Sequence, residues 1–85
     1  MLITPKQSLE KAIAIIGGQV ATAKALEVSQ PTIWKWLNST KEGLSAEYVR
    51  PLCQAVEWQV TPHELRPDLY PHPHDGLPEH LRSAA

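Results

Sequence analysis

Apolar residues recur at spacings of three and four along the first part of the chain, a pattern typical of amphipathic helices. The segment "TPKQSLEKAIAIIGG" (residues 4–18) carries one such stripe. Its members are Leu9, Ala12, Ile13 and Ile16. Thr4 is a suitable N-cap, Pro5 fits the first helical position, and the glycine pair supplies a left-handed exit. This pattern predicts a first helix.

Two short helices separated by a break are predicted within "QVATAKALEVSQPTIWKWLN" (residues 19–38). The first runs from Gln19 to Leu26, with an apolar face made of Val20, Ala23 and Leu26. The second begins with Ser29 as N-cap and has Pro31 in its first turn, where proline is tolerated. Its predicted buried stripe is Ile33, Trp36 and Leu37.

The segment "NSTKEGLS" is read as a loop, after which a fourth helix is predicted with Ser45 as its N-cap. The inner face of this helix is Val49, Leu52, Cys53 and Val56. Pro51 implies either a kink or a later start of the regular helix. "TPHE" (residues 61–64) is a capping box that opens a short fifth helix ending before Pro67. No strand-like alternation occurs, so the predicted fold is all-α.

The composition changes at residue 71. "PHPHDGLPEHLRSAA" has three Pro, one Gly and only two Leu as large apolar residues, too few to offset the entropy of ordering. We therefore expect one domain over residues 1–70 and a flexible tail over residues 71–85. The tail histidines lack a preformed supporting shell, so no metal site is predicted.

The middle of the chain follows the helix-turn-helix plan. The helix crossing needs a small residue, which Ala23 supplies, and the turn needs an inward hydrophobic residue, which Val28 supplies. Ile33 and Trp36 anchor the second helix, while Lys35 points nearly opposite to them on a helical wheel. The outward side of this stretch is thus free for a partner.

"VSQPTIWKWL" resembles the second helix of Cro- and cI-type phage repressors. Together with "GGQ" (17–19) and "HELRPDLYP" (63–71), it resembles the YdaS-type group of small prophage proteins, known as antitoxins or Cro-like repressors. The resemblance covers roughly residues 8–71. It implies a lambda-repressor-like helix-turn-helix domain of four to five helices with a flexible C-terminal tail.

The resemblance also implies roles for single residues. Gln19 would contact a phosphate and brace Gln30, Ser29 would contact the backbone or a base, and Lys35 would read a base edge. The full set predicted to contact DNA is Gln19, Ser29, Gln30, Thr32, Trp34, Lys35, Asn38 and Lys41.

Two residues depart from the family pattern. Glu27 stands where the turn usually has Gly, so either a left-handed conformation costs on the order of 1 kcal/mol or the turn differs. Trp34 stands where a small polar residue is usual. It could pack on a neighbouring loop, form a protein interface, or contact a sugar or a thymine methyl, and partial packing is the favoured interpretation.

Charge and composition narrow the class of protein. The net charge is −1, but residues 1–41 carry five Lys and two Glu, and residues 42–85 carry three Arg and seven acidic residues. The first half of the chain is therefore basic and the second half acidic.

The single cysteine, Cys53, fits a reducing compartment and is predicted to be a core residue. No signal peptide, membrane span, cofactor motif or catalytic constellation is apparent. We expect a non-enzymatic, cytoplasmic, nucleoid-associated bacterial protein.

The sequence thus predicts a Cro-type transcriptional repressor bound to a double-stranded operator. The alternative is an antitoxin that acts mainly by binding a toxin partner; the short, weakly patterned tail favours the repressor. We expect a weak dimer, or a monomer that pairs on DNA. The candidate dimer surface, which could instead close the core, is Trp58, Val60, Leu65, Leu69 and Tyr70.

Overall fold

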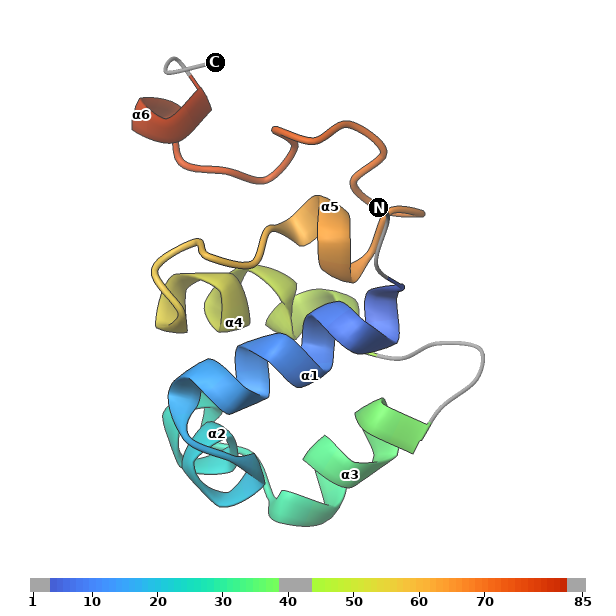
Figure 1. Ribbon diagram of the computed structural model, residues 1–85, viewed down its shortest axis with the longest axis vertical. Helices are drawn as coiled ribbons and strands as arrows, with labels where there is room; N and C mark the ends of the chain where they lie inside the picture. The colour runs from blue at the N-terminus through green and yellow to red at the C-terminus, as the bar shows by residue number, and fades with distance from the viewer. Residues whose placement is uncertain (1–3, 39–43, 83–85) are drawn as a thin grey trace.

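The computed structural model describes residues 4–38 and 44–82, and all regular structure in these ranges is helical (Figure 1). The elements are α1 (Pro5–Ile16), α2 (Gln19–Leu26), α3 (Gln30–Asn38), the 3₁₀ helix η1 (Ala46–Tyr48), α4 (Val49–Ala55), α5 (Pro62–Leu65) and α6 (Glu79–Arg82). The predicted all-α fold is confirmed. The predicted four to five helices of the domain correspond to α1 to α5; the 3₁₀ helix η1 and the single turn of α6, which lies in the predicted tail, come in addition.

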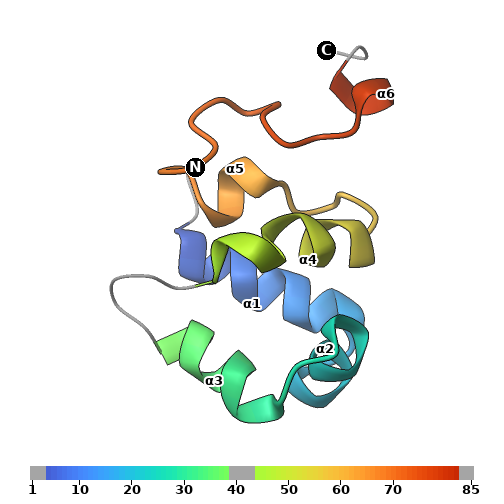
Figure 2. The ribbon, with the colours of Figure 1, turned by 180° about the vertical axis from the view of Figure 1, so that it is seen from behind.

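Helix α1 lies at the centre of the domain and contacts α2, α3, α4 and α5. Helices α2 and α3 form one end of the molecule, and α5 and α6 lie toward the other, as both views of the ribbon show (Figures 1 and 2). The α2–α3 pair and α6 therefore lie at opposite ends of the molecule.

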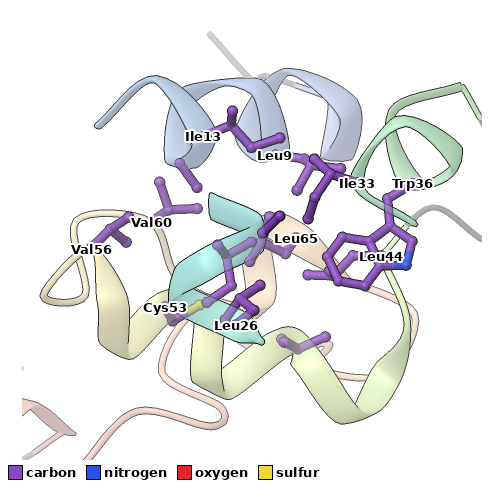
Figure 3. Packing of buried hydrophobic residues seen from close by; sticks show 14 residues of the cluster. Leu9, Ile13, Leu26, Ile33, Trp36, Leu44, Cys53, Val56, Val60 and Leu65 are labelled. Atoms are coloured by element: carbon purple, nitrogen blue, oxygen red, sulfur yellow. The ribbon is translucent and has the colours of Figure 1, made fainter. Parts of the chain in front are cut away.

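A single apolar core joins helices α1 to α5 (Figure 3). It consists of Leu9, Ala12, Ile13, Ala23, Leu26, Ile33, Trp36, Leu44, Val49, Leu52, Cys53, Val56, Val60 and Leu65. Trp36 also packs on Tyr48, with ring centroids 5.2 Å apart, which links α3 to η1. The predicted inner faces of α1, α3 and α4 are confirmed by these contacts.

Two helices begin with capping boxes: the one at Thr61 was predicted, whereas at Thr4 the sequence predicted only the N-cap. Thr4 Oγ1 accepts a hydrogen bond from the Gln7 backbone N–H (3.1 Å), and the Thr4 N–H donates to Gln7 Oε1 (2.9 Å). At α5, Thr61 Oγ1 accepts from the Glu64 N–H (3.2 Å) and the Thr61 N–H donates to Glu64 Oε1 (3.0 Å). In each box two otherwise unpaired N–H groups of the helix start are satisfied reciprocally.

The fourth helix becomes α-helical only at Val49, four residues after its predicted N-cap, Ser45. Ser45 precedes η1, and within the described residues its side chain forms no capping bond. The α-helical part starts at Val49, so Pro51 is the third residue of α4, where a missing N–H removes no intrahelical bond. Of the two alternatives for Pro51, the later start is the one observed.

Helices α2 and α4 end in the same motif, with Glu in a left-handed conformation. Glu27 has φ 57° and ψ 42°, and the N–H of Val28 donates to the Ala23 carbonyl (2.9 Å). After α4, Glu57 has φ 54°, and the N–H of Trp58 donates to the Cys53 carbonyl (2.8 Å). These six-to-one bonds define Schellman caps. Of the two alternatives for Glu27, the left-handed conformation is the one observed.

The "LRPD" segment holds the connection after α5 against the start of η1. Arg66 Nη1 donates to the Leu44 carbonyl (2.7 Å), and its Nε and Nη2 donate to Asp68 Oδ1 (3.0 Å) and Oδ2 (2.8 Å). The bidentate Arg66 contact lowers the pKa of Asp68. This motif therefore joins segments 22 residues apart.

The segment after residue 70 folds back onto the domain. Arg50 Nε donates to the Gly76 carbonyl (3.0 Å), and the Arg50 guanidinium lies 5.9 Å from the centroid of Trp58. Gly76 has φ +79°, and a Cβ there would lie 2.8 Å from both Pro62 Cγ and Tyr70 Cε1. Only glycine fits this approach. The flexibility of residues 71–85 stays a prediction.

The predicted dimer surface is largely internal, which corrects that interpretation. Val60 and Leu65 are buried, and Trp58 and Tyr70 pack against the core. Leu69, 46% exposed, is the one member of the set left outside. These residues close the domain core, the alternative that the sequence left open.

Candidate nucleic-acid interface

The crossing of α2 and α3 depends on the residues that the helix-turn-helix plan requires. Ala23 is buried in the core cluster, and Val28, in the turn, packs against that cluster. A small side chain allows close approach of the two helices, and Val28 turns inward because the left-handed Glu27 reverses the chain. The predicted roles of Ala23 and Val28 in the fold are confirmed.

The inner face of α2 differs from the prediction at one position. Val20 is 53% exposed, whereas Thr22 is fully buried. Thr22 can be buried because its Oγ1 donates to the Gly18 carbonyl (2.8 Å), which satisfies the hydroxyl. The observed stripe is therefore Thr22, Ala23 and Leu26, and Val20 lies on the surface beside Gln19.

Helix α3 has one anchored face and one free face. Ile33 and Trp36 are buried, and Leu37 packs against the core. Pro31, Trp34 and Lys35 are exposed. A nine-residue helix with this division presents its free side chains to a partner without loss of packing.

The first residues of α2 and α3 meet at a shallow groove. Gln19, Gln30, Pro31 and Trp34 line this groove, which has a volume of about 290 Å³. Gln19 is half-buried and Gln30 is exposed. The structure thus brings together the two glutamines that the family resemblance pairs, and Trp34 lies beside them.

Two polar pairs occupy the rest of the free face. The hydroxyls of Ser29 and Thr32 lie 2.8 Å apart, and the Ser29 carbonyl accepts from the N–H of Thr32 (3.1 Å) as α3 begins. Asn38 Nδ2 donates to the Trp34 carbonyl (2.8 Å). Lys41 lies outside the described residues.

Trp34 lies on the outward side of α3, as the helical periodicity predicts. It is 58% exposed, so the domain covers less than half of its accessible surface. Lys24, exposed on α2, is a basic residue that the predicted set omits. Residues 19–38 carry these two lysines, Lys24 and Lys35, and one acidic residue, Glu27, so the net charge of this segment is +1.

Within residues 4–38 and 44–82, no group of three or more His, Cys, Asp or Glu side chains is arranged to hold a metal ion. In the same part of the chain, no helix is both long enough and apolar enough to cross a membrane.

The fold and this surface define a small helix-turn-helix domain. Residues 9–74 match the family model described as "Bacterial toxin YdaS", and the chain belongs to this family. It is 37% identical over 62 residues to a protein of Escherichia coli (strain K12) described as "Putative transcriptional regulator YdaS". That alignment covers 73% of this chain and 62% of the relative. No solved structure gave a significant match.

Proposed function

We propose that the protein is a sequence-specific DNA-binding transcriptional repressor of Cro type. The observation that carries this proposal is the division of α3, in which Ile33 and Trp36 are buried while Lys35 is exposed. Helix-turn-helix proteins place such a free face in the major groove. The description of the E. coli relative as a transcriptional regulator supports the same function for the shared segment.

In this proposal the polar side chains divide into two roles. Gln30 pairs with adenine and Lys35 donates to guanine O6 and N7, because these side chains match the major-groove edges of those bases. Gln19 and Ser29 hold phosphates at the N-terminal ends of α2 and α3, where backbone N–H groups favour anions. Base contacts specify the site, and phosphate contacts fix the register.

Two copies are proposed to cover one palindromic operator. One α3 contacts too few base pairs to select a site, and paired helix-turn-helix domains read half-sites about 10 base pairs apart. In free solution the protein is then either a weak dimer or a monomer, and in both cases two copies pair on the DNA.

Selection from a random double-stranded library with the full chain tests this function. The expected result is an enriched inverted repeat whose half-sites are about 10 base pairs apart. A reporter promoter carrying the selected site should be repressed when the protein is expressed. Failure to enrich any sequence over a protein-free selection would exclude sequence-specific binding.

A second candidate function is supported by the description of the family as a bacterial toxin. In this alternative the protein belongs to a toxin–antitoxin pair and acts mainly by binding a partner protein. The α3 variants separate the two functions. If expression of the protein alters growth through DNA, Lys35→Ala should weaken this effect together with operator binding. An effect on growth that is undiminished in a folded Lys35→Ala variant would favour the partner protein.

A further inference from the structure

Trp34 is a large apolar side chain left in solvent. Among the described residues it is the most exposed of the large hydrophobic side chains, at 58%. The fold does not need this exposure, because Trp36, two positions later, is 6% exposed and supplies the aromatic anchor of α3. Exposed Pro31 lines the same groove, so Trp34 belongs to a local apolar patch and is not a single scattered side chain, which favours contact with an apolar group of the partner.

The surroundings of Trp34 are apolar on one side and polar on the other. Pro31, one turn earlier, and Trp34 line the same groove as Gln19 and Gln30. Lys35 follows Trp34 on the exposed face. A base that meets this groove therefore encounters a carbon surface beside hydrogen-bonding side chains.

Polar side chains close to Trp34 in the sequence are paired within α3 and at its start. Asn38 Nδ2 donates to the Trp34 carbonyl (2.8 Å). The nearby hydroxyls of Ser29 and Thr32 are paired with each other at 2.8 Å. The indole of Trp34, together with Pro31, is thus the apolar part of the groove lining.

The chemistry of the major groove limits what such a ring can read. All four bases present hydrogen-bonding atoms there, and thymine alone adds a C5-methyl group beside its O4 acceptor. An indole has one N–H donor and no acceptor, so it cannot form the bidentate pairs that identify adenine or guanine. An apolar contact with the thymine methyl is the recognition that suits its surface.

We infer that Trp34 is a specificity-determining residue that packs on the C5-methyl group of one thymine in the operator. This inference rests on the proposed function, since it places the α3 face in the major groove. Most members of the resembled family have a small polar residue at this position. Trp34 instead contributes selectivity through an apolar contact with one base.

The test replaces each thymine of the selected site, one at a time, by deoxyuridine, which lacks only the methyl group. At one position per half-site, the parent protein should bind the deoxyuridine site about fourfold more weakly, as expected for loss of one buried methyl. Trp34→Ala should bind the thymine and deoxyuridine sites equally. Trp34→Phe should keep the preference, because it retains an apolar ring.

Leu69→Ala is the matched control, since it removes another exposed large apolar side chain from a segment distant from α3 (Figure 1). This variant should keep the thymine preference of the parent. The inference fails if no deoxyuridine substitution weakens the parent, or if folded Trp34→Ala keeps the same preference. Tight, sequence-selective binding in either case leaves the proposed function standing, whereas absence of any selected site defeats both.

Discussion

Trp34 and Trp36 are two residues apart in α3 and lie in opposite environments, with Trp34 58% exposed and Trp36 6% exposed. At about 100° per residue, neighbours two positions apart cannot share one face of a helix. Trp36 packs on Tyr48 in the core, and Trp34 lines the groove with Gln19 and Gln30. The pair thus marks the boundary between the anchored and the free face of the helix.

Alanine substitutions at the two tryptophans should have different effects on stability. Trp36→Ala leaves a cavity between α3 and η1 and should lower the free energy of unfolding by about 3–5 kcal/mol. Trp34→Ala removes an exposed side chain and should change it by less than about 0.5 kcal/mol. Urea unfolding followed by circular dichroism measures both. Equal losses would mean that Trp34 is part of the core.

The left-handed cap at Glu27 should be improved by glycine. Glu27→Gly relieves the Cβ contact at φ 57° and should raise the free energy of unfolding by about 0.5–1 kcal/mol. Glu57→Gly, at φ 54°, should act in the same direction. Glu10→Gly, inside α1, is the control and should destabilise by about 1 kcal/mol. Thermal melts in which all three variants lose stability would contradict the role assigned to the cap.

Stability should fall at high pH because of Cys53. Burial in the core, assisted by Glu64 and opposed by Arg50, raises the pKa of this thiol from 9.0 to about 12. Below pH 9 the thiol is neutral in both states, so it has no effect. Between pH 9 and 12 the unfolded chain releases a proton that the folded chain retains, which favours unfolding.

Comparison with Cys53→Ala isolates this effect from other titrating groups. Above pH 9, the free energy of unfolding of the parent should fall more steeply than that of the variant. The slope difference should approach about 1.4 kcal/mol per pH unit. Parallel pH profiles for the two proteins would show that Cys53 ionises freely in the folded state.

Removal of the segment after residue 70 should spare DNA binding. This segment packs near α5 through Gly76 and Arg50, at the end of the molecule opposite to α3 (Figure 2). A chain ending at Tyr70 should bind the selected operator within about twofold of the parent, since no base-contacting residue is lost. A large loss in an electrophoretic or anisotropy assay would indicate that the segment reaches the DNA.

The sequence predicts most of the fold because local signals agree with burial. The capping boxes at Thr4 and Thr61 and the limits of α2 need only neighbouring residues for their explanation. Val20 was misplaced because Thr22 is buried through a bond to the Gly18 carbonyl, which apolar spacing does not register. The fold-back at Gly76 depends on Pro62 and Tyr70, so it is a tertiary feature.

The candidate site likewise combines features that follow from neighbouring residues with features that depend on tertiary packing. The exposure of Gln30, Lys35 and Asn38 follows from helical periodicity once Ile33 and Trp36 are assigned to the core. The shared groove of Gln19 and Trp34 requires the crossing of α2 and α3, which periodicity within one helix does not give.

The central claim, that the free face of α3 reads DNA, is tested most directly by operator affinity of Lys35→Ala and Gln30→Ala, measured at one stated salt concentration. Each variant should lose about 1–3 kcal/mol on the selected site and become less selective at one base pair. Lys11→Ala, which removes the same charge from an exposed position of α1, should lose much less. If folded Lys35→Ala and Gln30→Ala bind the selected operator as tightly as the parent, α3 is not the recognition helix.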